Sequence, residues 1–102
     1  MEGMELLCFQ IISFNGSARS SYIEAIQAAK EGDFEKADSL IKDGEANFVE
    51  GHKIHAQLIQ KEANGEMGEM SLLLLHAEDQ LMSAETLKIV ATELIEVYRR
   101  LK

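Results

Sequence analysis

Apolar and small side chains recur along this chain at steps of three and four residues, which is the period of an α-helix. The first repeat covers residues 4–31 and the second covers residues 34–63. The third begins within residues 66–71 and continues to the C-terminus. The pattern therefore predicts an all-α chain made of three long helices.

Glycine and short polar residues mark the two breaks between these repeats. Gly32 ends the first, because glycine readily adopts the left-handed conformation of a helix stop, and Asp33 can cap the helix that follows. Asn64-Gly65 ends the second and leads into the polar stretch GEMGEMS. Two short connections between long helices predict an antiparallel up-down-up three-helix bundle, in which residues 1–102 form one domain.

The stretch FNGSARSS, residues 14–21, is the one point where the first helix could break, because Asn15-Gly16 is a turn signal. A glycine inside a helix costs about 1 kcal/mol relative to alanine. The apolar repeat nevertheless stays in phase from Ile11 to Tyr22. We therefore predict one continuous helix, in which Gly16 allows another segment to approach closely.

The third helix carries more apolar surface than one helical seam requires. A second stripe lies beside the one predicted to face the core, and three helices cannot easily cover both. We therefore expect the chain to self-associate, in an order that the pattern leaves open. The residues of this second stripe are Leu72, Leu75, Met82, Ile89 and Val97.

Composition narrows the classes of partner. The chain has 46 % apolar residues, no proline, and 10 basic against 18 acidic residues, for a net charge of −8. Nucleic acids and anionic membranes attract Lys and Arg clusters, so neither is an expected partner. No apolar run approaches the roughly 20 residues that cross a bilayer, and the start lacks the basic segment of a secretion signal. We expect a soluble cytoplasmic protein without direct membrane insertion, whose single cysteine, Cys8, is a buried core residue.

The segment LLLLHAEDQLMSAE, residues 72–85, places polar side chains on an otherwise apolar helix. At about 100° per residue, Ser83 lies almost beneath His76, with Gln80 about 40° to one side and Asp79 about 60° to the other. An aspartate in an apolar stripe is costly unless it is paired, bound to a metal or hydrated. These four residues therefore form a polar track with candidate function.

Two further histidines, His52 and His55, project from neighbouring turns of the second helix. They can be ordinary edge-of-core residues, or they can complete a metal or phosphate site with His76. A histidine can act as a metal ligand or as a phosphoryl acceptor, and the residues alone leave both open. Glu78 lies on the far side of the third helix, and we predict that it plays no part in the site.

Three segments resemble one known family. HAEDQLMSA resembles the H-[AG]-Q-D-H-L-M-[TS] segment of the IIA component of the bacterial sugar phosphotransferase system, lactose/cellobiose (diacetylchitobiose) family. GSARSSYIEAIQAAKEGDFEKADSLI is similar to the family's G-x-A-R-S…EAL…A…GDF-x-x-A-D-x-L, and GHKIHAQLIQKEANGE to its A-H-x-x-Q-T-x-L segment and following loop. The resemblance covers nearly the whole chain in register.

This resemblance implies a helical-bundle subunit that assembles as a homotrimer. It implies that His76 accepts a phosphoryl group from the carrier HPr and passes it to a cysteine of the IIB component. IIB then phosphorylates a β-linked disaccharide (cellobiose, diacetylchitobiose or lactose) that enters through the membrane component IIC. Asp79 aligns with the aspartate whose copies hold Mg²⁺ at the trimer axis, and Gln80, His52 and Ser83 are implied supporting residues.

The sequence departs from the family pattern at two positions of the histidine segment. Gln80 replaces a histidine, so it can donate a hydrogen bond but supplies no positive charge, and Glu78 replaces a glutamine. His55 also stands where the family has glutamine. Two alternatives therefore remain: a metal-binding bundle with His52, His55 and His76 as ligands, and a regulatory IIA-like interaction module without transfer.

Overall fold

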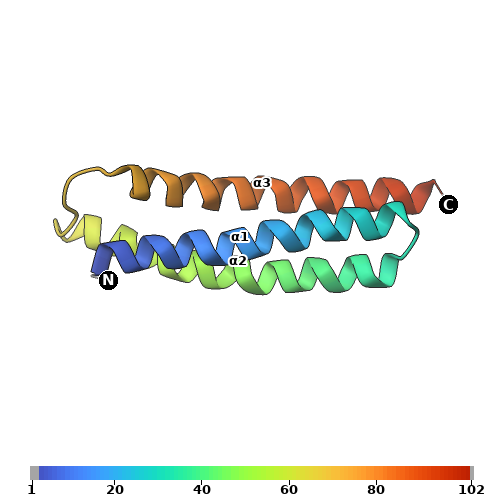
Figure 1. Cartoon of the computed structure of the whole chain (residues 1–102), viewed down its shortest axis with the longest axis horizontal. Helices are drawn as coiled ribbons and strands as arrows, with labels where there is room; N and C mark the ends of the chain where they lie inside the picture. Colours follow the sequence, from blue (N-terminus) through green and yellow to red (C-terminus); the bar gives the residue numbers. More distant parts are fainter. Residues whose placement is uncertain (1–2, 102) are drawn as a thin grey trace.

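The computed structural model describes residues 3–101, which form the helices α1 (Gly3–Lys30), α2 (Phe34–Ala63) and α3 (Leu72–Arg100). The helices lie side by side as long rods, with principal extents of 53 × 19 × 18 Å (Figure 1). The start of α1 and the α2–α3 connection lie at one end of the bundle, and the α1–α2 turn and the end of α3 at the other. α1 contacts both partners extensively, whereas α2 and α3 contact each other least. The predicted antiparallel three-helix architecture is confirmed.

Both connections stop and restart the helices by local backbone chemistry. Gly32 and Gly65 have φ angles of 83° and 72°, in the left-handed region that favours glycine. The Asp33 carboxylate accepts a hydrogen bond at 3.1 Å from the backbone N–H three residues later, and so caps α2. The Ser71 hydroxyl caps α3 in the same way at 3.1 Å. α3 consequently begins at Leu72, just after the range that the sequence predicted.

α1 continues through Asn15-Gly16, as the phase of the repeat predicted. The expected close approach at Gly16 is wrong within the described chain, because no atom beyond its chain neighbours and the adjacent backbone of α1 lies within 4 Å of a Cβ built there. The close approaches occur in α2 instead. A Cβ at Gly44 would overlap the Tyr22 ring, and one at Gly51 would lie 2.7 Å from the Asn15 amide nitrogen. These two glycines let α1 pack closely against α2.

The core extends along the whole bundle and changes composition along its length. Near the start of α1 it contains large side chains together with Cys8, which is 1 % exposed, as predicted. Towards the α1–α2 turn it is built mainly from alanines. Phe14 follows Ile11 by three residues in the apolar repeat but is only half-buried, whereas its polar neighbour Asn15 is fully buried. Within residues 3–101, no helix is long and apolar enough to cross a membrane.

The second apolar stripe of α3 is exposed, as the sequence predicted. Leu72 is 84 % exposed and Met82 is 65 % exposed, although both are large apolar residues. Nothing in the described part of the chain covers this face of α3. Its members Leu75, Ile89 and Val97 are about half exposed or more.

Candidate functional site

His76 lies at the start of the second turn of α3, five residues after the Ser71 cap. Its neighbour Ala77 is fully buried, together with Leu74 and Leu81 on the same face, and this buried face turns the His76 imidazole outward. Beside it lies an open, mostly apolar hollow of about 420 Å³, lined by Leu72, Leu73 and His76. The site therefore presents an accessible imidazole in apolar surroundings on a rigid helix.

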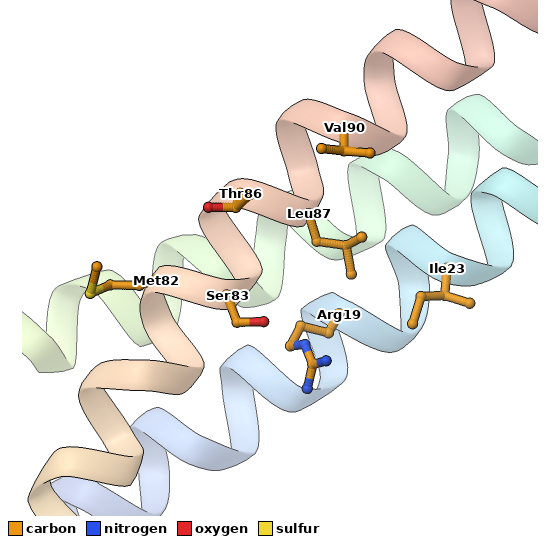
Figure 2. Close-up of a pocket in the computed structure, with 7 residues that line it drawn as sticks. All are labelled: Arg19, Ile23, Met82, Ser83, Thr86, Leu87 and Val90. Carbon is orange, nitrogen blue, oxygen red and sulfur yellow. The ribbon is translucent and has the colours of Figure 1, made fainter.

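The polar track predicted from the helical period is present on α3. His76 and Asp79 are exposed, whereas Gln80 and Ser83 are half-buried towards α1. Arg19 of α1 donates a hydrogen bond from Nη1 to the Gln80 Oε1 at 3.4 Å. Figure 2 shows Arg19 and Ser83 on the two sides of a groove between α1 and α3, which is lined otherwise mainly by apolar side chains.

Arg19 is the residue of this site that sequence reasoning missed. It lies 61 residues before Gln80, in the segment FNGSARSS, which the sequence marks only as a possible helix break and as part of the family resemblance. The helical period marks it as the neighbour of buried Ala18, but it cannot show which helix its side chain meets. The packing of α1 against α3 brings its guanidinium to the polar track.

Glu78, which the helical period places away from the site, has a role in the fold. Its Oε1 atom lies 2.6 Å from Nε2 of His55, whose side chain is 15 % exposed. The far side of α3, where the period places Glu78, is the side that faces α2. The pair therefore joins the two helices that otherwise contact each other least.

The three histidines do not meet at one point. His55 is engaged by Glu78, and the exposed His52 has its ring centroid 6.0 Å from that of Phe48 and 6.5 Å from that of His55. Among residues 3–101, no group of three His, Cys, Asp or Glu side chains is arranged to hold a metal ion. The structure thus gives no support to a metal-binding bundle with His52, His55 and His76 as ligands of one ion.

Cys8 plays no part in the site. Burial raises the pKa of its thiol, and the Glu78 carboxylate raises it further, because both disfavour the negative thiolate. A protonated thiol is a poor nucleophile and a poor metal ligand. Cys8 is therefore a buried core residue, as the sequence predicted.

Fold and site together define an all-α three-helix domain that carries an exposed histidine on α3. The sequence model of the PTS system, Lactose/Cellobiose specific IIA subunit, matches residues 6–99, and the chain belongs to this family.

Similar proteins match nearly the whole length of the chain in sequence and in structure. The lichenan-specific phosphotransferase enzyme IIA component of Bacillus subtilis is 47 % identical, over 98 % of this chain and 91 % of that protein. The cellobiose-specific enzyme IIA of Bacillus anthracis superposes with a TM-score of 0.95 at 42 % identity, covering 99 % of this chain and 93 % of that one. The IIA(Chitobiose) of Escherichia coli, solved in complex with HPr, gives a TM-score of 0.84 at 32 % identity, with 99 % and 98 % covered. This chain is thus a IIA component of the sugar phosphotransferase system, a member of a phosphoryl relay.

Proposed function

We propose that His76 is the phosphoryl acceptor of this IIA component, which takes the group from HPr and passes it to a cysteine of IIB. The observation that carries the proposal is the exposed imidazole of His76 beside an apolar hollow on α3. The complex of IIA(Chitobiose) with HPr supports HPr as the donor. We propose that IIC takes part only indirectly, as the membrane component through which the sugar enters. We also propose that the relay operates in the cytoplasm.

The proposed reaction transfers one phosphoryl group twice. A neutral imidazole nitrogen of His76 attacks the phosphorus of the phosphohistidine on HPr, and the broken P–N bond returns its electron pair to the donor imidazole. The thiolate of the IIB cysteine later attacks the same phosphorus and releases His76. Such a transfer depends on positioning and charge stabilisation more than on proton transfer.

The supporting residues differ in how well the structure fits their proposed roles. Gln80 and Ser83 offer an amide and a hydroxyl on the two turns that follow His76, which suits hydrogen bonding to a phosphoryl group. His52 lies on α2, with its ring near those of Phe48 and His55. The supporting role of His52 stays a prediction from the family resemblance.

We also propose a homotrimer in which the exposed stripes of three α3 helices cover one another. Asp79 is exposed and lies in this stripe, between Leu75 and Met82. Three Asp79 carboxylates around one axis would repel one another unless a hard cation lay between them, and Mg²⁺ prefers such oxygen ligands. The donor chemistry of Asp79 fits Mg²⁺ in such an assembly, where the ion would neutralise the carboxylates and stabilise the trimer.

The proposed sugar is a β-linked disaccharide: cellobiose, diacetylchitobiose or lactose. The name of the family contains lactose and cellobiose. The structural relatives from Bacillus anthracis and Escherichia coli are named for cellobiose and chitobiose. In this proposal the membrane component IIC recognises the sugar, so this chain affects the choice of sugar only through the partners that it binds.

Reconstitution of the whole relay tests this proposal. Enzyme I, HPr, phosphoenolpyruvate, IIB and membranes containing IIC are combined with the wild-type protein or with His76→Ala, and sugar phosphate is measured for each of the three disaccharides. We expect sugar phosphate with the wild type and none with His76→Ala. A wild-type protein that binds IIB but supports no sugar phosphate would favour the regulatory module, and equal product with both proteins would exclude His76 as the acceptor.

A further inference from the structure

We propose that Arg19 of α1 is a positioning residue of the phosphoryl site. It fixes the side-chain amide of Gln80 so that the amide NH₂ group is free to donate to a phosphoryl group on His76. This inference rests on His76 as the acceptor. It explains how the neutral Gln80 can support the phosphoryl group at a position where the family pattern has a histidine.

The direction of the Arg19–Gln80 contact follows from the chemistry of the two groups. A guanidinium has only donors, so the amide must turn its oxygen, and not its nitrogen, towards Arg19. The distance from Nη1 to Oε1 is 3.4 Å, which fits this arrangement. The two branches of an amide diverge, and the NH₂ group of Gln80 therefore points away from Arg19.

The position of Gln80 on the helix directs that NH₂ group to the acceptor. Gln80 follows His76 by one turn on the same face of α3. Helical side chains lean towards the N-terminal end, so the Gln80 side chain covers the surface next to His76. An amide held in the opposite orientation would present its oxygen to the negative phosphoryl oxygens and repel them.

Arg19 also brings a positive charge to a track that otherwise lacks one. Its side chain is half-buried between α1 and α3, and its Nε atom is buried without a hydrogen-bond partner among residues 3–101. The guanidinium is thus held at the helix interface rather than extended into solvent. A hydrogen bond to Oε1 from a cation polarises the amide and strengthens its N–H groups as donors.

The test measures the rate of phosphoryl transfer from phosphorylated HPr by rapid quench, in two backgrounds. Arg19→Met keeps the apolar stem but removes the charge and the donors, and we expect it to slow transfer about tenfold, equal to about 1.4 kcal/mol. In the Gln80→His background, where an imidazole can donate and carry charge by itself, the same change should alter the rate less than twofold. Arg19→Lys, which retains a cationic donor, should recover part of the loss.

Two outcomes overturn the inference about Arg19, and a third defeats the proposed function. An unchanged rate in Arg19→Met, or an equal loss in both backgrounds, overturns the inference, because a merely structural role would act whichever residue occupies position 80. Melting temperature and oligomer mass of each variant show whether the fold is intact. A wild-type protein that accepts no phosphoryl group at His76 defeats the proposed function itself, whereas acceptance that ignores Arg19 defeats only this inference.

Discussion

At the scale of single residues, the close contact of α1 with α2 depends on two glycines that face buried side chains. Gly44 lies under the ring of Tyr22 and Gly51 under the amide of Asn15. Both side chains are fully buried and have no room to move aside. The packing of the bundle is therefore more sensitive to an added methyl group at these positions than at Gly16.

Gly44→Ala is expected to lower the free energy of unfolding by about 1–3 kcal/mol, because its Cβ would overlap the buried Tyr22 ring. Gly16→Ala is the matched control. It adds the same methyl group inside a helix where nothing beyond the chain neighbours and the adjacent backbone of α1 lies within 4 Å, and should raise stability by up to about 1 kcal/mol. Urea denaturation at one protein concentration measures both. Changes of the same sign and size would contradict the assigned contact.

Tyr22 provides a pH prediction. Burial, and secondarily the Glu45 carboxylate, raise its pKa to about 12, compared with about 10 in the unfolded chain. The folded state thus favours the neutral phenol, so the stability linked to Tyr22 is fully present below about pH 10 and falls as the pH rises towards 12. Tyr22→Phe should show a smaller loss of stability between about pH 10 and 12 than the wild type does. An alkaline loss in Tyr22→Phe as large as in the wild type would contradict the assignment.

The sequence predicted four residues of the candidate site and missed Arg19 for a physical reason. His76, Asp79, Gln80 and Ser83 share one face of one helix, so the helical period is sufficient to group them. Arg19 joins them only through the packing of α1 against α3, and a single helix's period carries no information about its neighbour's rotation.

At the scale of the elements, the helices and their ends were predictable because their signals are local. Glycines with positive φ and the caps Asp33 and Ser71 lie within a few residues of the ends they define. The contact between His55 and Glu78 was not predictable in this way. This contact depends on the rotation of α3 relative to α2. It gives an interhelical role to Glu78, which the helical period placed away from the site.

Glu78→Ala is expected to lower the free energy of unfolding by about 1–2 kcal/mol, because it removes the 2.6 Å hydrogen bond that joins α3 to α2 and leaves the largely buried His55 without it. Glu78→Gln can still accept from His55, so it should cost less. Thermal and urea unfolding at neutral pH measure both variants. Glu78→Ala with wild-type stability would show that the pair contributes nothing to the bundle.

At the scale of the whole molecule, the two main surface features are the exposed stripe of α3 and the net charge of −8. The proposed homotrimer covers the stripe, and the acidic surface suits docking proteins that present basic or apolar faces. Self-association is a prediction from the width of the apolar surface, and the number of copies is implied only by the family resemblance.

Asp79→Leu tests the proposed assembly. The change removes the carboxylate and continues the apolar stripe, so we expect the trimer to persist without bound Mg²⁺ and the acceptor to retain its activity within a few-fold. Light scattering gives the oligomer mass, and metal analysis of the purified protein gives the Mg²⁺ content. Ile89→Glu, which places a charge in the same stripe, should weaken the trimer. Equal Mg²⁺ in the wild type and Asp79→Leu would rule out Asp79 as its ligand.

The central claim, that His76 accepts the phosphoryl group, is tested most directly by locating that group. The pure protein is incubated with enzyme I, HPr and phosphoenolpyruvate, and the acid-labile phosphate is located by intact mass and peptide mapping. The account predicts one phosphoryl group per chain, on His76, and none in His76→Ala. An unmodified wild-type protein in the presence of fully phosphorylated HPr, or a group on another residue, would contradict it.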